Sequence, residues 1–339
     1  MSGVNVAVVG ATGAVGEEFL RLFELRKYPI KSLRLLASAR SAGKKLKFAG
    51  KDHTVEELKP DSFRGIEQAF FSAGGSISKE YAPHAAKAGA IVIDNTSAFR
   101  YEKEIPLVVP EINPQDAFEY GARRIIANPN CTTIVALLPT YPLHKAFGLK
   151  RAVMSSYQAI SGAGAQAMEE LQQQMRDWAA GKPLTVKIAP KQIAFNVIPR
   201  IDAVQDNGYT KEEMKFLWEG QKIMHHATLR ATATCVRVPV LRSHSVSLNL
   251  EFEKPCTAEA AREILRKAPG VVVQDDPRTE IYPIPLERSL KDEIGVGRIR
   301  QDVSVDGNKG LCLWAVGDQI MKGAALNAIQ IGELLLRGK

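Results

Sequence analysis

The chain has few cysteines, no long apolar run and no dense basic segment, and each absence excludes a class of protein. Its 339 residues include 4 cysteines that lie far apart, without a C-x-x-C pair or a histidine at zinc-ligand spacing. We therefore expect neither a disulfide framework nor a metal site, and we expect reduced thiols in the cytoplasm. No apolar run reaches the roughly 20 residues of a membrane span, and the first residues show no secretory signal.

The charge is moderately basic, with 45 Lys and Arg against 37 Asp and Glu and a formal net charge of +8. This excess fits an ordinary solvated surface, or a surface that attracts anionic small molecules. Nucleic acid binding is disfavoured because no stretch packs about five basic residues together. With 45% hydrophobic and 24% charged residues, the composition is typical of a globular protein of about two domains.

In the first part of the chain, strand-like runs alternate with helix-like segments. Short apolar or β-branched runs occur at 4–9, 33–37, 68–72, 90–93 and 125–127, and helical spacing occurs at 14–26 and 78–89. Such alternation predicts βαβ units around a parallel sheet.

Beyond about residue 150 the strand-like segments become longer and alternate apolar with polar residues. They cover 151–158, 234–240, 245–253, 298–305 and 311–316, with helices expected at 163–180, 211–226, 257–268 and 318–336. Thr257 is a plausible N-cap, and the last helix is amphipathic. This pattern predicts a mainly antiparallel α+β domain.

A glycine-rich loop joins the first strand to the first helix. Its sequence is Gly10-Ala11-Thr12-Gly13-Ala14-Val15-Gly16, one residue longer in its first half than the standard dinucleotide fingerprint. Glycines permit a tight turn, and the helix N-terminus offers N–H groups to a pyrophosphate. Its position in a βαβ array favours a dinucleotide over a bare strand-to-helix turn.

The segment after the second strand indicates which dinucleotide binds. No acidic residue stands between Ile30 and Gly43 to hold a ribose 2′-OH, whereas Ser38, Arg40 and Ser41 suit a 2′-phosphate. We therefore predict NADP, the alternative being a solvated basic turn. The small residues around Ala73 and Gly74 would let the cofactor pass close to the backbone, or form a turn only.

Cys131 is the strongest candidate for a nucleophile. It follows Asn128-Pro129-Asn130 and opens the apolar helix-like run 132–138, where the helix dipole favours the thiolate. Cys235 and Cys312 lie within strands and Cys256 lies at an element edge, so we expect these to be inert. A thiolate beside a nicotinamide site suggests attack on a carbonyl followed by hydride transfer.

Such chemistry needs a proton shuttle, and His244 is a candidate. It lies between two strand-like runs, seven residues after Arg237. The alternative is a surface histidine at a strand end.

Taken together, these motifs resemble the aspartate-β-semialdehyde dehydrogenase family. The resemblance covers essentially the whole chain and rests on the glycine loop 10–16, 38–43, 94–100, 128–131, 158–164, 212–215, 237–240, His244 and 317–319. The stretch Gln172-Gln173-Gln174 matches no motif of that family, so dimer contacts there are not implied.

The resemblance implies a fold of the α/β plus α+β class. Residues 1–130 would form a Rossmann-type NADP-binding domain, 131–316 a catalytic and dimerisation domain, and 317–339 a helix returning to the first domain. The protein would be a homodimer or homotetramer without nucleic acid or membrane partners.

The resemblance also implies residue roles. Cys131 would be the nucleophile, His244 the acid–base group and Gln158 the residue that orients the substrate. Arg237 would bind the substrate carboxylate and Glu212 its amino group. Glu212 rather than Glu213 follows from the Glu-x-x-Lys spacing, which puts Glu212 and Lys215 on one helix face. Phosphate would be held by Arg100, Asn130 and Lys215. NADP would be contacted by Gly10, Thr12, Gly13, Ala14, Val15, Ser38, Arg40, Ser41, Ala73, Gly74, Ser161, Gly162 and Gln319.

The implied reaction is the NADPH-dependent reductive dephosphorylation of L-4-aspartyl phosphate to L-aspartate 4-semialdehyde, which serves lysine (diaminopimelate), threonine and methionine biosynthesis. Two alternatives remain. An N-acetylglutamyl-phosphate reductase would share the thioester chemistry but would not need Glu212. A non-catalytic NADP-binding regulator would need neither Cys131 nor His244.

Overall fold

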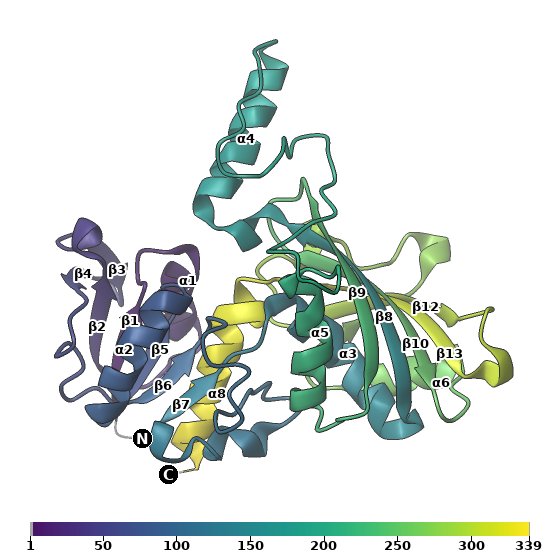
Figure 1. The fold of residues 1–339 in the computed structure, drawn as a ribbon, viewed down its shortest axis with the longest axis horizontal. Helices are drawn as coiled ribbons and strands as arrows, with labels where there is room; N and C mark the ends of the chain where they lie inside the picture. Colours follow the sequence, from purple (N-terminus) through teal and green to yellow (C-terminus); the bar gives the residue numbers. More distant parts are fainter. Residues whose placement is uncertain (1–2, 339) are drawn as a thin grey trace. The chain divides into compact units, whose positions relative to one another are not determined.

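The computed structural model describes residues 3–338, which form two compact units. The first unit comprises the chain up to Asn130 together with the segment from Ala324 onward, and the second comprises Cys131–Gly323. Figure 1 shows the chain path, with the first unit in purple and blue apart from its yellow C-terminal helix. Among the described residues, none of the helices combines the length and the apolar character that crossing a membrane requires.

The first unit is built on a seven-stranded sheet in the order β3-β4-β2-β1-β5-β6-β7. Its strands are β1 (Val4–Val9), β2 (Ile30–Ala37), β3 (Lys45–Phe48), β4 (Lys51–Glu57), β5 (Gln68–Phe71), β6 (Ile91–Asp94) and β7 (Ile125–Ala127). All neighbours run parallel except β3 and β4. The chain order reverses at β1, which pairs with β2 on one side and β5 on the other, so the carboxyl ends of these strands meet at a topological switch point.

Three long helices complete the first unit: α1 (Ala14–Leu25), α2 (Gly75–Lys87) and α8 (Leu326–Arg337). The C-terminal helix α8 packs against α1 and β6. Gly332 permits this packing, because a Cβ there would lie 2.3 Å from the Tyr28 hydroxyl. Arg26 and Glu333 add a two-bonded ion pair with both distances at 2.7 Å.

The second unit is built on a six-stranded sheet in the order β11-β12-β13-β10-β8-β9. Its strands are β8 (Leu149–Ala159), β9 (Arg230–Val238), β10 (His244–Phe252), β11 (Val271–Val273), β12 (Ile294–Gln301) and β13 (Gly310–Gly317). The three central pairings are antiparallel, whereas the two outer ones are parallel. Helices α3 (Cys131–Phe147), α5 (Lys211–Ile223) and α6 (Ala258–Arg266) pack on this sheet, with α3 in contact with both others. A short helix, α7 (Pro285–Arg288), packs on β13.

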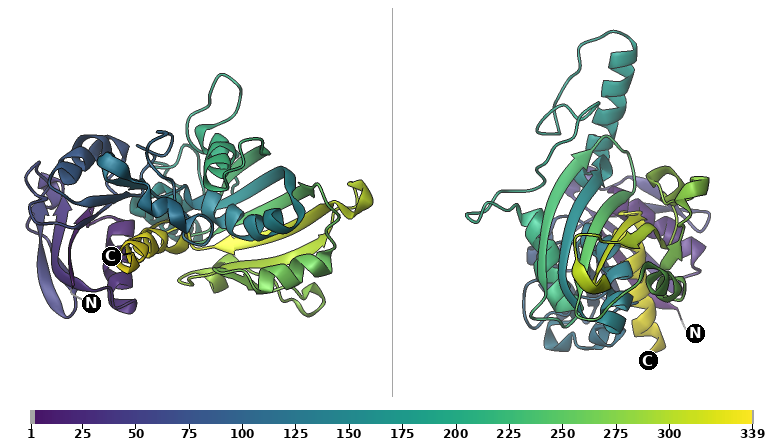
Figure 2. Two further views of the ribbon diagram at one scale, coloured as in Figure 1. Left: turned by 90° about the horizontal axis from the view of Figure 1, so that it is seen from below. Right: turned by 90° about the vertical axis from the view of Figure 1, so that its right-hand side faces the viewer.

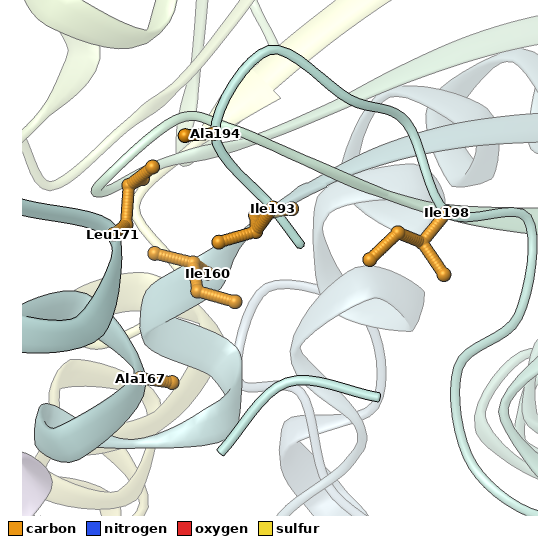
Figure 3. Packing of buried hydrophobic residues seen from close by; sticks show 6 residues of the cluster. All are labelled: Ile160, Ala167, Leu171, Ile193, Ala194 and Ile198. Atoms are coloured by element: carbon orange, nitrogen blue, oxygen red, sulfur yellow. The ribbon is translucent and has the colours of Figure 1, made fainter. Parts of the chain in front are cut away.

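Helix α4 (Ala165–Ala179) stands away from the sheet of its own unit, and the loop after it returns along its side (Figures 1 and 2). Its base is fixed by a buried apolar cluster of Ile160, Ala167, Leu171, Ile193, Ala194 and Ile198 (Figure 3). The buried Glu170 accepts hydrogen bonds from the backbone of residues 187–189. Gln174 accepts from the backbone of 193 and 194 and donates to Thr185.

This arrangement explains the glutamine stretch that matched no family motif. Gln174 is buried and holds the returning loop on α4, so its role within the chain is structural. Gln173, in contrast, is exposed and bonds within the helix to Arg176 and Asp177.

The fold class predicted from the sequence is confirmed. The predicted N-cap Thr257 is confirmed as well, because its side chain accepts a hydrogen bond from the backbone of Ala260 at the start of α6. The hairpin β3–β4 was not expected, because its two strands are largely exposed and lysine-rich and carry little apolar pattern. The strand expected at 298–305 is β12, which begins four residues earlier at Ile294. The added part contains Gly297, where a Cβ would lie 2.1 Å from the Gln274 carbonyl oxygen.

Other boundaries also differ from the prediction, among them the end of β9 and the start of the last helix. Strand β9 ends at Val238 instead of 240, because Pro239 cannot donate a ladder hydrogen bond. The last helix begins later than 318, as a π-helical turn over Met321–Ala325 that continues into α8.

Candidate active site

In the first unit, two glycine-containing loops lie at the carboxyl ends of β1 and β5. Gly10 has a φ of +85°, and a Cβ on it would lie 2.4 Å from the Ser72 carbonyl oxygen, so only glycine fits there. Helix α1 has Gly13 as N-cap, and α2 has Gly74 with a φ of +95°. Neither N-cap makes a side-chain capping bond, so the first-turn N–H groups suit a pyrophosphate.

The residues expected to bind the adenosine end follow β2. Ser38, Arg40 and Ser41 form a 3₁₀ turn in which Arg40 is exposed and Ser41 is buried. The Thr12 hydroxyl of the glycine loop donates to Ser41 Oγ at 3.4 Å, so the two segments are neighbours. The expected first-unit contacts lie on the loops after β1, β2 and β5 and in the first turn of α1, namely Gly10, Thr12, Gly13, Ala14, Val15, Ser38, Arg40, Ser41, Ala73 and Gly74. These residues fit a dinucleotide with a 2′-phosphate.

Arg100 and Asn130, the expected phosphate ligands of the first unit, are both buried. The Arg100 guanidinium donates to the carbonyl of Asn128 at 2.9 Å and to that of Asn95 at 2.7 Å. It therefore ties the loop after β6 to the loop after β7. Asn130 directly precedes Cys131 in the chain.

Cys131 is the first residue of α3, as the sequence predicted, and it is only partly buried. The other three cysteines are buried. Burial raises the pKa of Cys235 and of Cys256 to about 12, and it also raises the pKa of Cys312. Gly323 lies against the nucleophile, because a Cβ on it would lie 2.7 Å from Cys131 Cβ. Cys131 thus combines access with a helix N-terminus, the setting of a reactive thiol.

His244 is completely buried, so the alternative of a surface histidine is wrong. The backbone N–H of Ala159 donates to its Nδ1 at 3.0 Å, which leaves the proton of the neutral ring on Nε2. Nε2 has no hydrogen-bond partner among residues 3–338. Burial, followed by the Arg237 charge, lowers the pKa of His244 to about 3. The ring is therefore neutral at physiological pH and presents an N–H donor.

Arg237 lies beside His244 at the turn Ile160–Ala163. A Cβ on Gly162 would lie 2.8 Å from Arg237 Nη1 and 3.4 Å from His244 Nε2. The guanidinium donates to the Ala159 carbonyl at 2.8 Å, and burial lowers the pKa of Arg237. Gly162 therefore leaves room for these two side chains to lie close to the same point of the turn.

Gln158 and Arg237 are register partners on the adjacent strands β8 and β9. The Gln158 amide accepts from Ser156 and donates to Glu212 Oε1, both at 3.0 Å. Glu212 Oε2 accepts from Lys215 at 2.7 Å, which agrees with the predicted shared helix face. A carboxylate, two cations and an amide thus face one another from three elements.

Glu213 is engaged elsewhere. It forms a capping box with Thr210 at the start of α5 and accepts from the backbone of Cys235 at 3.1 Å. Of the two candidates for the substrate amine, Glu212 is therefore the one whose carboxylate points to Gln158.

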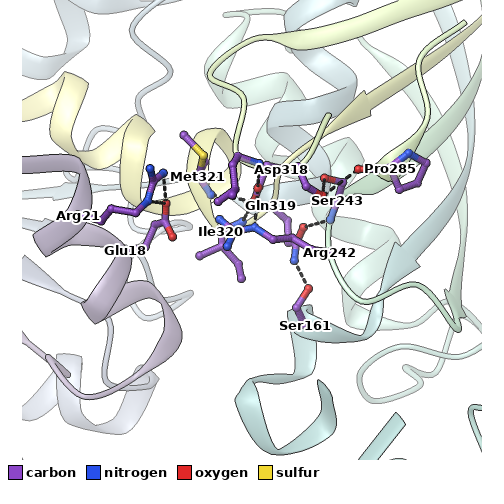
Figure 4. Close-up of polar contacts among 12 residues, drawn as sticks. Glu18, Arg21, Ser161, Arg242, Ser243, Pro285, Asp318, Gln319, Ile320 and Met321 are labelled. Carbon is purple, nitrogen blue, oxygen red and sulfur yellow. Dashed lines mark hydrogen bonds and ion pairs between the residues drawn. The ribbon is translucent and has the colours of Figure 1, made fainter. Parts of the chain in front are cut away.

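Ser161 and Gln319, two further expected cofactor contacts, are bonded to each other (Figure 4). Gln319 also accepts from the backbone of Ser243 at 2.8 Å. Its neighbour Asp318 is completely buried and accepts from Arg242. Sequence reasoning assigned no role to Arg242, Ser243 or Asp318; their position directly beside His244 and Gln319 was the available signal.

Within residues 3–338 no cluster of three or more histidine, cysteine or acidic side chains could hold a metal ion. The second unit brings together a thiol at a helix start, a neutral imidazole donor, an arginine and a glutamate–lysine pair. These groups suit covalent attack on the acyl carbon of a small substrate that carries both a carboxylate and an amine.

Two family models match the chain. The model described as the NAD binding domain of semialdehyde dehydrogenase matches residues 5–120, and the one described as its dimerisation domain matches residues 141–322. The aspartate-semialdehyde dehydrogenase of Aquifex aeolicus is 51% identical over 337 residues, covering 99% of this chain and 98% of that protein.

Solved structures agree with these matches. Aspartate semialdehyde dehydrogenase II of Vibrio cholerae, complexed with ASA, is similar with a TM-score of 0.96 at 44% identity, covering 99% of both chains. The aspartate semialdehyde dehydrogenase of Candida albicans with NADP gives a TM-score of 0.74 at 27% identity, covering 98% of both chains.

Proposed function

The chain belongs to the aspartate-semialdehyde dehydrogenase family, and on this premise we propose how its residues carry out the reaction. The reaction is the NADPH-dependent reductive dephosphorylation of L-4-aspartyl phosphate to L-aspartate 4-semialdehyde, a step of amino-acid biosynthesis. The observation that carries the residue assignment is that Arg237 and His244 border the same glycine, while Glu212 reaches Gln158, the register partner of Arg237.

NADP is the cofactor, and the first unit is suited to hold it. Two glycine-capped helices follow β1 and β5, and the turn Ser38–Ser41 offers hydroxyls and a guanidinium without an acidic residue. The 2′-phosphate would be held by Arg40 and Ser41 and the pyrophosphate by the N–H groups that follow Gly13. When bound, the reduced nicotinamide supplies the hydride. Ser161, Gly162 and Gln319 are proposed as the second unit's contacts.

The substrate's charges match those of the second unit. Arg237 would bind the α-carboxylate with its planar guanidinium, and Glu212 would bind the α-ammonium group. Gln158 lies between them and would orient the side chain of the substrate. The cations Arg100 and Lys215, with Asn130, would hold the phosphate group. A substrate with an acetylated amine would leave the Glu212 carboxylate facing a neutral amide, which argues against the N-acetylglutamyl-phosphate alternative.

The covalent steps involve Cys131 alone. Its thiolate attacks C4 of aspartyl phosphate, and the bond between C4 and the phosphate oxygen breaks. Inorganic phosphate departs, and C4 remains bound to Cys131 as an acyl thioester. After the carbonyl carbon has been reduced, the C–S bond of the thiohemiacetal breaks. Aldehyde and thiolate are released, so the nucleophile is regenerated. The reverse, oxidative direction uses the same groups.

His244 would act at the substrate oxygen. Its Nε2–H can hydrogen-bond the oxyanion as negative charge builds, share its proton with that oxygen, and take it back when the thiohemiacetal collapses. The backbone N–H of Cys131, at the start of α3, is a second candidate donor to the oxyanion. His244 is thus proposed as the acid–base group in its neutral, Nε2-protonated form.

The match to a dimerisation domain indicates an oligomer, and we propose a homodimer or homotetramer. Tyr157 and Trp314 support this, because their rings pair at 5.3 Å and remain partly exposed on the β-sheet. Trp178 of α4 and Phe195 of the loop after α4 form a second exposed aromatic pair. The partners are otherwise small molecules, with no nucleic acid and no membrane. A cytoplasmic location is proposed because the reaction requires Cys131 as a reduced thiol.

The proposal is tested by assaying phosphate-dependent reduction of NADP with aspartate semialdehyde. We expect turnover that requires both phosphate and NADP. Absence of turnover, or turnover without phosphate, would contradict the proposed reaction. Light scattering after gel filtration would measure the number of subunits, and a monomer would contradict the proposed assembly.

A further inference from the structure

Residues 242–243 and 318–319 form a buried polar connection just beyond the paired ends of β10 and β13. His244 and Gly317 are register partners at the end of that ladder. Two hydrogen bonds extend the connection beyond that end. Arg242 Nε donates to Asp318 Oδ2 at 2.5 Å, and the Ser243 backbone N–H donates to the Gln319 side chain at 2.8 Å (Figure 4). The two residues before His244 are therefore both held by the two residues after β13.

Ser243 needs such support, because its backbone is strained. Its φ is +75°, a left-handed conformation that is unfavourable for a residue other than glycine. Ser243 is fully buried, and its hydroxyl pairs with that of Ser289 at 2.9 Å. Its conformation determines the direction in which the chain enters β10, and hence where the His244 ring lies.

Asp318 is hydrogen-bonded to Arg242, two residues before His244, and to the turn 320–323, which lies against Cys131. Oδ2 accepts from Arg242 and from the backbone of Leu290, at 2.5 and 2.7 Å. Oδ1 accepts from the backbone of Ile320 and Met321 at 2.9 and 3.1 Å, and the Asp318 carbonyl accepts from Gly323 at 3.0 Å. This second set of bonds shapes the turn that places Gly323 against Cys131.

We propose that Asp318 is a positioning residue, which fixes the His244 imidazole relative to the Cys131 thiol through Arg242–Ser243 on one side and the 320–323 turn on the other. The inference rests on the proposed roles of Cys131 and His244. Asp318 is fully buried and all four bonds to its carboxylate are donated by other groups, so its effect on the reaction is indirect.

The chain offers a matched control. The Asp275 side chain is also buried, and it accepts from Arg262 Nε at 2.8 Å and from the backbone of Ile299 at 3.2 Å. The two arginine side chains are similarly exposed, at 24% for Arg242 and 23% for Arg262. Both ion pairs belong to the second unit, but Asp275 follows β11 and, within residues 3–338, makes no hydrogen bond to the residues beside His244.

The experiment compares Asp318→Asn with Asp275→Asn in the full-length enzyme. In Asp318→Asn an amide N–H would face Arg242 or the Leu290 N–H, so we expect kcat to fall on the order of 100-fold, the cost of a misplacement of about 1 Å. The KM values for aspartate semialdehyde and NADP should stay within about threefold, because the binding groups are unchanged. Asp275→Asn should lose comparable thermal stability but keep kcat.

A second readout follows the imidazole itself. In histidine-labelled protein, nitrogen NMR distinguishes the tautomers, and the His244 signal is assigned with His244→Gln. We expect a single Nε2-protonated form in the wild type and in Asp275→Asn, and mixed tautomers in Asp318→Asn. If Asp318→Asn does not fold, Arg242→Gln removes the same ion pair from the other side and should give the same loss of kcat.

The outcomes separate the two proposals. A wild type that is inactive on aspartate semialdehyde would refute the proposed function. An active wild type whose Asp318→Asn and Arg242→Gln variants both retain kcat, or lose no more than Asp275→Asn, would refute the positioning role. A selective loss of kcat with altered His244 tautomers would support it.

Discussion

The backbone N–H of Ala159 donates a hydrogen bond to Nδ1 of His244 across 3.0 Å, and this contact determines which nitrogen carries the proton. Protonating the ring would place a second N–H against the Ala159 N–H, in a site that already contains the Arg237 charge. Burial and that charge together hold the pKa of His244 at about 3. A catalytic histidine that remains neutral and acts through its N–H has a precedent in triosephosphate isomerase.

The first prediction concerns stability and pH. Because the folded pKa of His244 is about 3 and the unfolded value about 6.5, the unfolded chain binds the extra proton between these values. The contribution of His244 to the free energy of unfolding is thus largest above pH 6.5 and decreases as the pH falls toward 3. The decrease amounts to at most about 1.4 kcal/mol per pH unit. Urea unfolding at pH 7.5, 6.0 and 5.0 measures this slope.

Replacing His244 with Gln should make that slope shallower. Equal slopes for the wild type and His244→Gln would show that folding does not lower the pKa of the His244 imidazole.

The second prediction concerns the nucleophile. Cys131→Ala should reduce turnover by at least about 10³-fold while the fold and NADP binding remain, because the covalent route is lost. Mass spectrometry of the wild type mixed with aspartate semialdehyde and NADP, without phosphate, should detect an acyl adduct on the peptide with Cys131. Cys312→Ala serves as the control, because Cys312 is buried within β13 and does not lie at the start of a helix. This variant should keep both the activity and the adduct. Substantial turnover by Cys131→Ala would exclude the thioester mechanism.

The third prediction concerns the choice of dinucleotide. Arg40→Ala removes the exposed guanidinium after β2 and should raise KM for NADP by roughly 10- to 100-fold, since a charged hydrogen bond contributes about 1.5–3 kcal/mol. Activity with NAD, which lacks the 2′-phosphate, should hardly change. The exposed Arg64 serves as control, because it lies in the loop between β4 and β5 and its loss removes the same charge. Equal use of NAD and NADP by the wild type would contradict the assignment of Ser38–Ser41.

Features that depend on the order of neighbouring residues could be predicted from the sequence. The start of α3 at Cys131 followed from an apolar run after Asn-Pro-Asn, and the Glu212–Lys215 pair followed from helix periodicity. The glycine loop followed in the same way from its strand-to-helix context.

What the sequence could not provide depends on long-range contacts. The register that pairs Gln158 with Arg237, and the partly buried ion pair of Arg242 and Asp318, join residues that are 79 and 76 positions apart. The left-handed Ser243 is likewise imposed by its partners, because serine has no intrinsic preference for a positive φ. The hairpin β3–β4 lacked a buried apolar face that would have revealed it.

The last prediction concerns which aldehyde is used. Arg237 is held by the Ala159 carbonyl beside Gly162, and Glu212 is held by Gln158 and Lys215, so the two charges are fixed before substrate binds. An N-acetylated substrate would leave the Glu212 carboxylate desolvated against a neutral amide, and unpaired buried groups give discrimination on the order of 10⁴. We therefore expect aspartate semialdehyde to react with phosphate and NADP while N-acetylglutamate semialdehyde hardly reacts.

Arg237→Lys tests the same assignment from the carboxylate side. Lysine keeps the charge but loses the planar two-bonded contact and the bond to the Ala159 carbonyl, so kcat/KM should fall by about 10²-fold or more. Arg151→Lys, at an exposed position of the neighbouring strand β8, should have no such effect. Comparable kcat/KM for the two aldehydes, or near-full activity of Arg237→Lys, would refute the substrate assignment. Either result would leave the thioester chemistry of Cys131 intact, because that step depends on the thiol and not on how the α-carbon substituents are held.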